Sequence, residues 1–118
     1  MDNLEKYLEF FESCINNDKV GTIIKEEGHI PFVNYHKTVS DFLQDFYDSE
    51  LLDKDYVENM NKFNNIIDTK KISSKLDIAT MLTHIVRKDR FVEGYLLKNI
   101  VNGTIYRILV KTSDDSLV

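Results

Sequence analysis

The sequence predicts a mainly α-helical fold, a compact bundle of about five to six helices in one domain that spans residues 1–118. Apolar residues recur at steps of three and four along most of the chain, which is the spacing of one helix face. The length of 118 residues suits a single hydrophobic core. Apolar residues make up 42% and charged residues 30%, a composition that excludes the disordered and membrane-spanning classes.

A first helix is expected over about residues 3–16. Its apolar face would hold Leu4, Tyr7, Leu8, Phe11, Cys14 and Ile15. The Asn-Asn-Asp run at 16–18 ends it, because these side chains compete for backbone hydrogen bonds. Residues 20–35 are the least regular stretch, with two of the four glycines and the only proline. A small β-hairpin or an ordered loop fits that stretch better than a helix.

Three further helices are expected over about residues 37–49, 53–64 and 75–87. The first of them follows the i, i+3, i+4, i+7 template without a miss, and its buried stripe is strongly aromatic. That stripe consists of Val39, Phe42, Leu43, Phe46 and Tyr47. The third helix has Ser73 or Ser74 available as its cap.

The last third of the chain allows two structures. Asp89 is expected to cap a helix that begins directly after it, by accepting from amides near Phe91 or Val92. The buried edge of that helix would hold Val92, Tyr95, Leu96 and Ile100. At Asn102-Gly103 the chain either stops one helix and begins another, or turns in a hairpin that pairs 95–101 with 104–110. The helical spacing of the apolar residues after Gly103 favours two helices, and residues 113–118 are expected to fray.

The net charge of −5 is unevenly distributed. Residues 1–68 carry 15 acidic against 6 basic side chains, a balance of −9, and residues 69–118 carry 5 against 9, a balance of +4. An acidic surface is expected along residues 41–58, formed by Asp41, Asp45, Asp48, Glu50, Asp53, Asp55 and Glu58. It is either a solvated face or a binding surface whose carboxylates would replace nucleic-acid phosphates in a basic channel of another protein.

A dense polar motif lies where two predicted helices join, and it reads Arg87-Lys88-Asp89-Arg90-Phe91-Val92-Glu93-Gly94. In a structural interpretation Asp89 caps a helix, while Arg87 and Glu93 form ion pairs across the junction. In a functional interpretation Arg87 and Arg90 form a fork for a carboxylate or a phosphate. Catalysis by Glu93 or His84 is a third interpretation.

The segment from Met81 to Lys111 resembles a known family. Leu82-Thr83, the motif Arg87-x-Asp89-Arg90-Phe91-x-Glu93-Gly94 and the run Asn102-Gly103-Thr104-Ile105 are similar to the carboxy-terminal signature of the bacterial family of unknown function DUF6508. The segment 31–35, Pro-Phe-Val-Asn-Tyr, and the amphipathic helix at 37–49 are comparable to its middle part. Members often carry tryptophans after that helix, and this chain has none. The resemblance implies a small, mainly helical domain and supplies no established activity.

Residues for metal or nucleophilic chemistry are scattered. His29, His36, His84 and Cys14 lack the paired spacing of a metal site, so no metal and no cofactor are expected. The sequence has no GxSxG elbow, and its glycines never gather into a phosphate-binding loop. Cys14 is expected to be a small buried hydrophobe, because no basic cluster lies beside it in the sequence to lower its pKa.

These patterns favour a non-enzymatic protein-interaction or regulatory module, and one specific form is an inhibitor of a nucleic-acid-handling or defence enzyme, encoded by a mobile element. The alternative is a small-molecule binder, or an unrecognised enzyme, that uses Arg87, Arg90 and Glu93. A protein partner is expected, whereas direct nucleic-acid binding is not, because the cations are dispersed. The absence of an apolar run of about 20 residues and of a secretory signal leads us to expect a cytoplasmic protein that binds no membrane.

Overall fold

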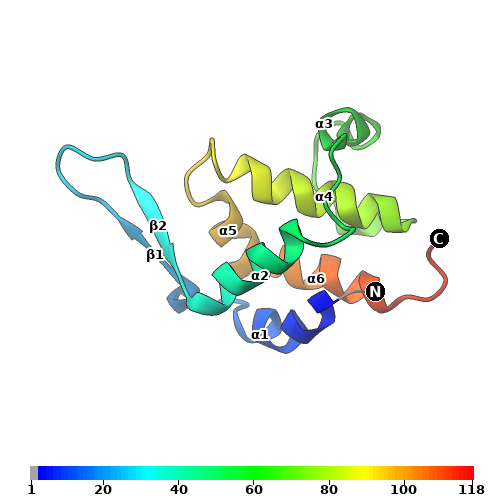
Figure 1. Ribbon diagram of the computed structural model, residues 1–118, viewed down its shortest axis with the longest axis horizontal. Coiled ribbons are helices and arrows are strands. Elements are labelled where there is room, and N and C mark those ends of the chain that lie inside the picture. Colours follow the sequence, from blue (N-terminus) through cyan, green and yellow to red (C-terminus); the bar gives the residue numbers. More distant parts are fainter. Residues whose placement is uncertain (1–2) are drawn as a thin grey trace.

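The computed structural model describes residues 3–118 and confirms the mainly helical fold, with six α-helices and one two-stranded sheet in that range (Figure 1). The helices are α1 (Leu8–Ser13), α2 (Lys37–Tyr47), α3 (Tyr56–Asn59), α4 (Lys75–Lys88), α5 (Tyr95–Val101) and α6 (Thr104–Val110). The strands are β1 (Gly21–Ile24) and β2 (Phe32–Tyr35). Short 3-10 turns cover Asn3–Tyr7, Asp18–Val20, Met60–Phe63, Thr69–Lys71 and Lys111–Ser113.

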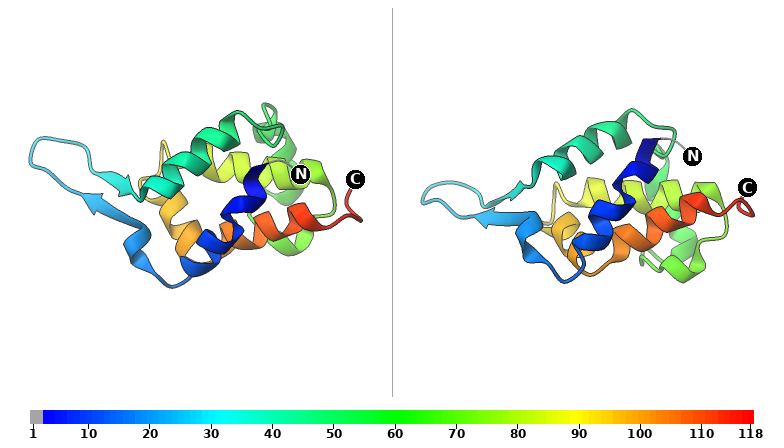
Figure 2. Two further views of the ribbon diagram at one scale, coloured as in Figure 1. Left: turned by 60° about the horizontal axis from the view of Figure 1, so that its bottom comes forward. Right: turned by 90° about the horizontal axis from the view of Figure 1, so that it is seen from below.

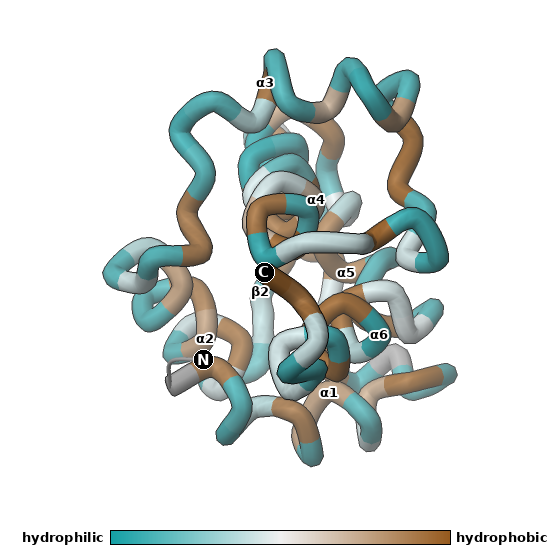
Figure 3. The backbone as a smooth tube through the Cα atoms, turned by 90° about the vertical axis from the view of Figure 1, so that its right-hand side faces the viewer, coloured by the Kyte–Doolittle hydropathy of each residue, from teal (hydrophilic) through white to brown (hydrophobic). Residues whose placement is uncertain are grey.

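Helix α4 is the centre of the helical body and packs against α3, α5 and α6. Nine of its 14 residues are buried, so most of its circumference is covered by other elements. Ser74 begins it as predicted, because its side chain accepts a hydrogen bond from the Asp77 amide at 3.1 Å. In Figure 3, hydrophobic and hydrophilic stretches alternate along α4 and α6, while the tube around α3 is mostly hydrophilic.

Aromatic rings join the amino-terminal segment to α2. Phe11 and Phe42 are both fully buried, and their ring centroids lie 4.9 Å apart in an edge-to-face arrangement. Tyr7 adds a second edge-to-face contact to Phe42 at 5.4 Å. Each buried aromatic of this kind stabilises the fold by about 1.5–3 kcal/mol. The predicted aromatic stripe of the 37–49 helix is therefore the face that anchors α2 to the body.

The β1–β2 hairpin projects from the helical body in every view (Figures 1 and 2). Its antiparallel register runs from Gly21 opposite Tyr35 to Ile24 opposite Phe32. At its base a Cβ on Gly21 would lie 3.2 Å from Leu97, so the hairpin meets α5 closely there. The structure thus confirms the hairpin expected between the first two helices and accounts for the long axis of 48 Å.

The carboxy-terminal segment forms two helices, as the apolar spacing predicted. Gly103 separates α5 from α6 with a φ of 86°, a left-handed conformation that favours glycine. The buried residues of α6 include Ile105, Ile108 and Leu109, which is the predicted set. No helix within residues 3–118 is long and apolar enough to cross a membrane.

Three expectations about local structure were wrong. The helix expected over 53–64 begins only at Tyr56 and consists of the single turn of α3 followed by the 3-10 turn Met60–Phe63. Asp53, which was expected on that helix, lies before it and is buried. The helix expected directly after Asp89 begins only at Tyr95. Val92 was expected to be buried on that helix, but it lies in the preceding loop and is 45% exposed.

Candidate functional site

Asp53 attaches residues 53–65, which contain α3 and which we call the α3 segment, to α4. Its Oδ2 accepts hydrogen bonds from Thr80 Oγ1 of α4 at 2.6 Å and from Asn59 Nδ2 at 3.0 Å. Its Oδ1 accepts from the Asp55 amide at 2.9 Å, and its own amide donates to Thr83 Oγ1 at 2.9 Å. These bonds hold the short α3 segment, which is too short to be stable alone, against the middle of α4.

The buried position of Asp53 corrects the expected acidic surface. The residue is 8% exposed, so its charge is not offered to a partner. Burial alone would raise the pKa of Asp53, but the hydrogen bonds from Asn59, Thr80 and the Asp55 amide outweigh burial and lower the pKa. Asp53 is therefore an ionised structural anchor.

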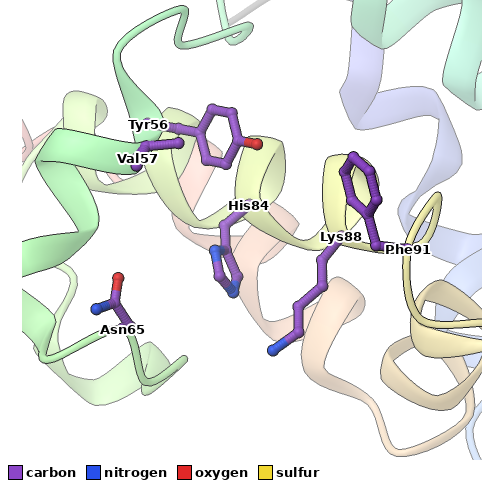
Figure 4. A pocket seen from close by; sticks show the side chains of 6 residues that line it. All are labelled: Tyr56, Val57, Asn65, His84, Lys88 and Phe91. Carbon is purple, nitrogen blue, oxygen red and sulfur yellow. The ribbon is translucent and has the colours of Figure 1, made fainter.

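A pocket of about 260 Å³ lies between the α3 segment and the carboxy-terminal part of α4 (Figure 4). We call it the His84 pocket. It is lined by Tyr56, Val57, Asn65, His84, Lys88 and Phe91. His84 and Lys88 leave α4 one turn apart and point to the same side, as residues four apart on a helix do, and Asn65 lies across from His84 (Figure 4).

His84 presents an unsatisfied imidazole at this pocket. Its Nε2 is buried and has no hydrogen-bond partner among the described residues. The rings of Tyr56 and Tyr95 lie edge-on to the imidazole, with centroids 6.4 and 6.3 Å away. Burial and the nearby Lys88 ammonium lower the pKa of His84, so the ring is neutral at neutral pH.

Lys88 is a half-buried cation without a counter-ion. Its Nζ lies 4.8 Å from the centroid of the Tyr95 ring, a cation–π contact. No described carboxylate oxygen lies within 4.0 Å of this nitrogen. Among the described residues, the Lys88 charge is therefore met by the Tyr95 ring, with no carboxylate beside it.

Large apolar side chains are exposed at the edge of the His84 pocket. Phe91, in the loop between α4 and α5, is 84% exposed, and Val57 of α3 is 67% exposed. Ile66, the neighbour of the lining residue Asn65, is 63% exposed. Exposed apolar groups that surround a concavity mark binding surfaces more often than isolated ones do.

The structure divides the predicted polar motif between different neighbours. Arg87 and Arg90 both approach Tyr47 of α2, with guanidinium carbons 5.6 and 5.9 Å from the ring centroid. Arg90 also donates to the Tyr47 hydroxyl at 3.4 Å. Arg87 Nε is buried without a hydrogen-bond partner among the described residues. Glu93 is exposed in the loop, and the described residues show no Arg87–Glu93 ion pair.

Asp89 has a different hydrogen-bond partner from the one expected. Its Oδ1 accepts from the Leu96 amide at 2.9 Å, so it caps α5 from seven residues away instead of from the adjacent turn. The Tyr35 hydroxyl donates to the same carboxylate at 3.3 Å and accepts from the Leu97 amide at 3.2 Å. Burial and the Asp89 charge raise the pKa of Tyr35. This network ties the base of the hairpin to the start of α5.

The acidic residues predicted on α2 differ in their surroundings. Asp41 pairs with Lys37 at 3.0 Å. Asp45 pairs with Lys6 at 3.0 Å and accepts a hydrogen bond from the Tyr7 hydroxyl at 2.6 Å.

Those hydrogen bonds also shift pKa values. The bonds from Tyr7 and Lys6 lower the pKa of Asp45, and burial with the Asp45 contact raises the pKa of Tyr7 to about 12. Asp48 is exposed and forms no ion pair with a described residue. Whether these residues bind a partner remains a prediction.

No group of three or more His, Cys, Asp or Glu side chains that could hold a metal ion comes together in the described part of the chain. Cys14 is buried, as expected, and burial raises the pKa of its thiol.

From the sequence, His84 was named as a candidate and Lys88 and Phe91 were placed in the polar motif without a role of their own, but Tyr56, Val57 and Asn65 were not identified as site residues. Two signals were available. His84 lies off the apolar stripe of its helix, and Phe91 stands among charged residues instead of on an apolar face. Neither signal shows that Tyr56 and Asn65, about 20–30 residues earlier in the chain, complete the concavity.

A family model described as a family of unknown function (DUF6508) matches residues 1–114. The match confirms the resemblance inferred from the carboxy-terminal segment. Neither a search of curated proteins nor a search of solved structures finds a match.

Proposed function

The chain belongs to the DUF6508 family, whose function is unknown, and we propose from the site itself that it is a non-enzymatic interaction module that docks a protein partner at the His84 pocket. The observation that carries this proposal is the pair of exposed apolar side chains, Phe91 and Val57, beside a concavity. Energetically dominant contacts in protein interfaces concentrate where an apolar or aromatic anchor enters such a pocket.

The size of the pocket suits one large side chain of a protein partner. Sites for drug-sized ligands and cofactors measure about 300–1,000 Å³. The His84 pocket, at about 260 Å³, lies near the lower end of that range, a size that accommodates one large side chain. The surrounding exposed residues Phe91, Val57 and Ile66 would then contact the partner around that anchor.

The experiment is affinity capture from the native host with tagged full-length protein. Phe91→Asp and Val57→Asp each place a charge beside the pocket, and each should remove the captured partner. Ile30→Asp is the matched control, because Ile30 is as exposed as Phe91, at 86% against 84%, but lies in the hairpin loop. Circular dichroism checks that all three variants stay folded. Capture that survives both pocket substitutions would contradict the proposal.

A second proposed role uses the acidic surface, and it is favoured by the exposure of its members Asp41, Asp48, Glu50, Asp55 and Glu58. In this role the carboxylates would replace nucleic-acid phosphates and inhibit a nucleic-acid-handling enzyme. The ion pair at Asp41 and the bonds to Asp45 reduce the free charge that such a surface offers. The double charge reversal Asp48→Lys with Glu50→Lys should abolish capture if this surface is the contact and should leave it intact if the His84 pocket is.

A further inference from the structure

We propose that the His84 pocket binds an apolar residue of the partner that bears, or directly adjoins, a carboxylate. The apolar side chain would lie against Tyr56, Val57 and Phe91, and the carboxylate would lie between Lys88 and His84. The proposal rests on the proposed function for the source of this ligand, which is a protein. Its chemistry rests on the pocket alone.

Charge complementarity argues for an anion. Lys88 is half-buried, and no described carboxylate neutralises it. A charge that is removed from water without a partner destabilises a complex. A ligand that covers Lys88 must therefore supply an opposite charge, or the ammonium is buried unpaired. A neutral apolar side chain would leave the Lys88 ammonium unpaired, whereas a side chain that bears a carboxylate would pair with it.

A second polar position argues for an oxygen ligand beside His84. Its Nε2 is buried without a hydrogen-bond partner among the described residues, and a buried polar atom without a partner destabilises a protein. The His84 and Lys88 side chains project together into the pocket region (Figure 4). In the tautomer that carries its proton on Nε2, the neutral His84 ring donates at this position, so the two oxygens of a carboxylate can contact the Lys88 ammonium and this N–H at once.

The walls of the pocket argue for an apolar body on the same ligand. Tyr56 and Phe91 present rings and Val57 presents methyl groups. The volume of about 260 Å³ accommodates one large side chain. A carboxy-terminal aromatic residue combines both features in one unit, and an aromatic residue followed by Asp supplies the same two groups.

Three tryptophan probes test the chemistry on the full-length protein. N-acetyltryptophan carries a terminal carboxylate, N-acetyltryptophan amide carries none, and N-acetyl-Trp-Asp-amide carries an internal one. Binding is followed by NMR shifts of the backbone amides and of the His84 ring. The acid should shift Val57, His84 and Phe91 and bind at least about tenfold more tightly than the neutral amide, a difference of about 1.4 kcal/mol. Comparison of the first and third probes decides between a terminal and an internal carboxylate.

Lys88→Met removes the charge but keeps the apolar stem, so it should abolish the preference for the acid over the amide. Lys98→Met is the matched control, because Lys98 is an exposed lysine of α5 outside the pocket lining, and it should leave the preference intact. The bound carboxylate should also raise the pKa of His84, whereas the amide should not. The other polar or titratable contacts of this ring are Lys88, Tyr56 and Tyr95, and they are the same with either probe.

Equal binding of the acid and the amide, or no shift at the pocket with any carboxylate probe, would overturn the proposal. Either result leaves the proposed function standing if Phe91→Asp and Val57→Asp still lose the partner. Conversely, tight carboxylate binding with partner capture unaffected by those two substitutions would reject the docking function and leave a small-ligand site.

Discussion

Replacement of Asp53 by alanine tests how the α3 wall of the His84 pocket is built. The carboxylate accepts hydrogen bonds from the Thr80 hydroxyl at 2.6 Å, the Asn59 side chain at 3.0 Å and the Asp55 amide at 2.9 Å. Asp53→Ala leaves all three donors without this acceptor. The consequence depends on which donors can turn to water.

The magnitude follows from the burial of each donor. Thr80 is 1% exposed, so loss of its acceptor costs about 1–3 kcal/mol. Asn59 is half-buried and Asp55 exposed, so water replaces most of their lost bonds, at about 0.5–1 kcal/mol each. We therefore expect Asp53→Ala to lower the free energy of unfolding by about 3 kcal/mol, measured by urea unfolding followed by circular dichroism at pH 7.

Two comparisons make the result decisive. Asp48→Ala also removes a carboxylate, but from an exposed position without an ion pair to any described residue, and it should change stability by less than about 0.5 kcal/mol. The pKa of Asp53 is lowered in the folded protein, so its stabilisation is present above the unfolded pKa of about 4 and is lost as pH falls through the folded pKa. The difference between wild type and Asp53→Ala should shrink at acidic pH. Equal stability of Asp53→Ala and wild type at pH 7 would refute the anchor.

Further predictions concern the rest of the framework. Gly28 and Gly103 both have positive φ, so alanine should cost about 1–2 kcal/mol at each position in urea unfolding. At Gly28 a Cβ meets open space. At Gly103 the Arg107 guanidinium 2.8 Å away can swing aside, but Ile15 Cδ1 at 3.3 Å must also shift, so the cost there should be slightly larger, and a smaller cost at Gly103 would contradict this packing. Burial alone would raise the pKa of Asp77, but its ion pair with Lys62 and its hydrogen bonds from Ser73 outweigh burial and lower the pKa. Lys62→Met removes the ion pair, so acid unfolding should move to higher pH. Acid titrations of wild type and Lys62→Met that superimpose would exclude this role. Tyr35→Phe removes a hydroxyl that donates to Asp89 and accepts from the Leu97 amide. The substitution should lower the free energy of unfolding by about 1–3 kcal/mol and speed amide hydrogen exchange in the hairpin. Unchanged exchange would contradict the network.

Elements whose signal is local were predictable from the sequence. Helix α2 follows an unbroken apolar repeat, and Ser74 supplies the cap of α4. Asn102-Gly103 was ambiguous because the same dipeptide ends helices and forms hairpin turns. The helical spacing after Gly103 decided correctly between them, because α6 buries that face.

Errors arose where a distant partner changes the role of a residue. In the sequence, Asp53 is indistinguishable from the other acidic residues of the run at 41–58. Its hydrogen bonds to Thr80 and Thr83 on α4 hold it in a buried position. Asp89 has the residue type of a helix cap, but its carboxylate accepts from the Leu96 amide and from the hydroxyl of Tyr35, which lies more than 50 residues earlier in the chain. Contacts between such distant positions leave no periodic trace in one sequence.

The His84 pocket could not be predicted for the same reason. Its residues come from three places along the chain, the α3 segment, the end of α4 and the loop that follows. Lys88 and Phe91 lie in the motif at 87–94, but no sequence pattern joins that motif to Tyr56, Val57 and Asn65. Arg87 and Arg90 were the stronger sequence signal, but the structure places both beside Tyr47. Whether they also hold an anion stays a prediction, which a thermal-shift screen with wild type and Arg90→Ala would test.

Site-specific photo-crosslinking in the native host tests the docking claim most directly. A photoreactive amino acid placed at position 57 or 91 should yield the same crosslinked partner, while one placed at Ile30 in the hairpin loop or at Asp48 on the acidic surface should yield none. Crosslinks that form only from Ile30 or Asp48, with positions 57 and 91 silent, would contradict the account.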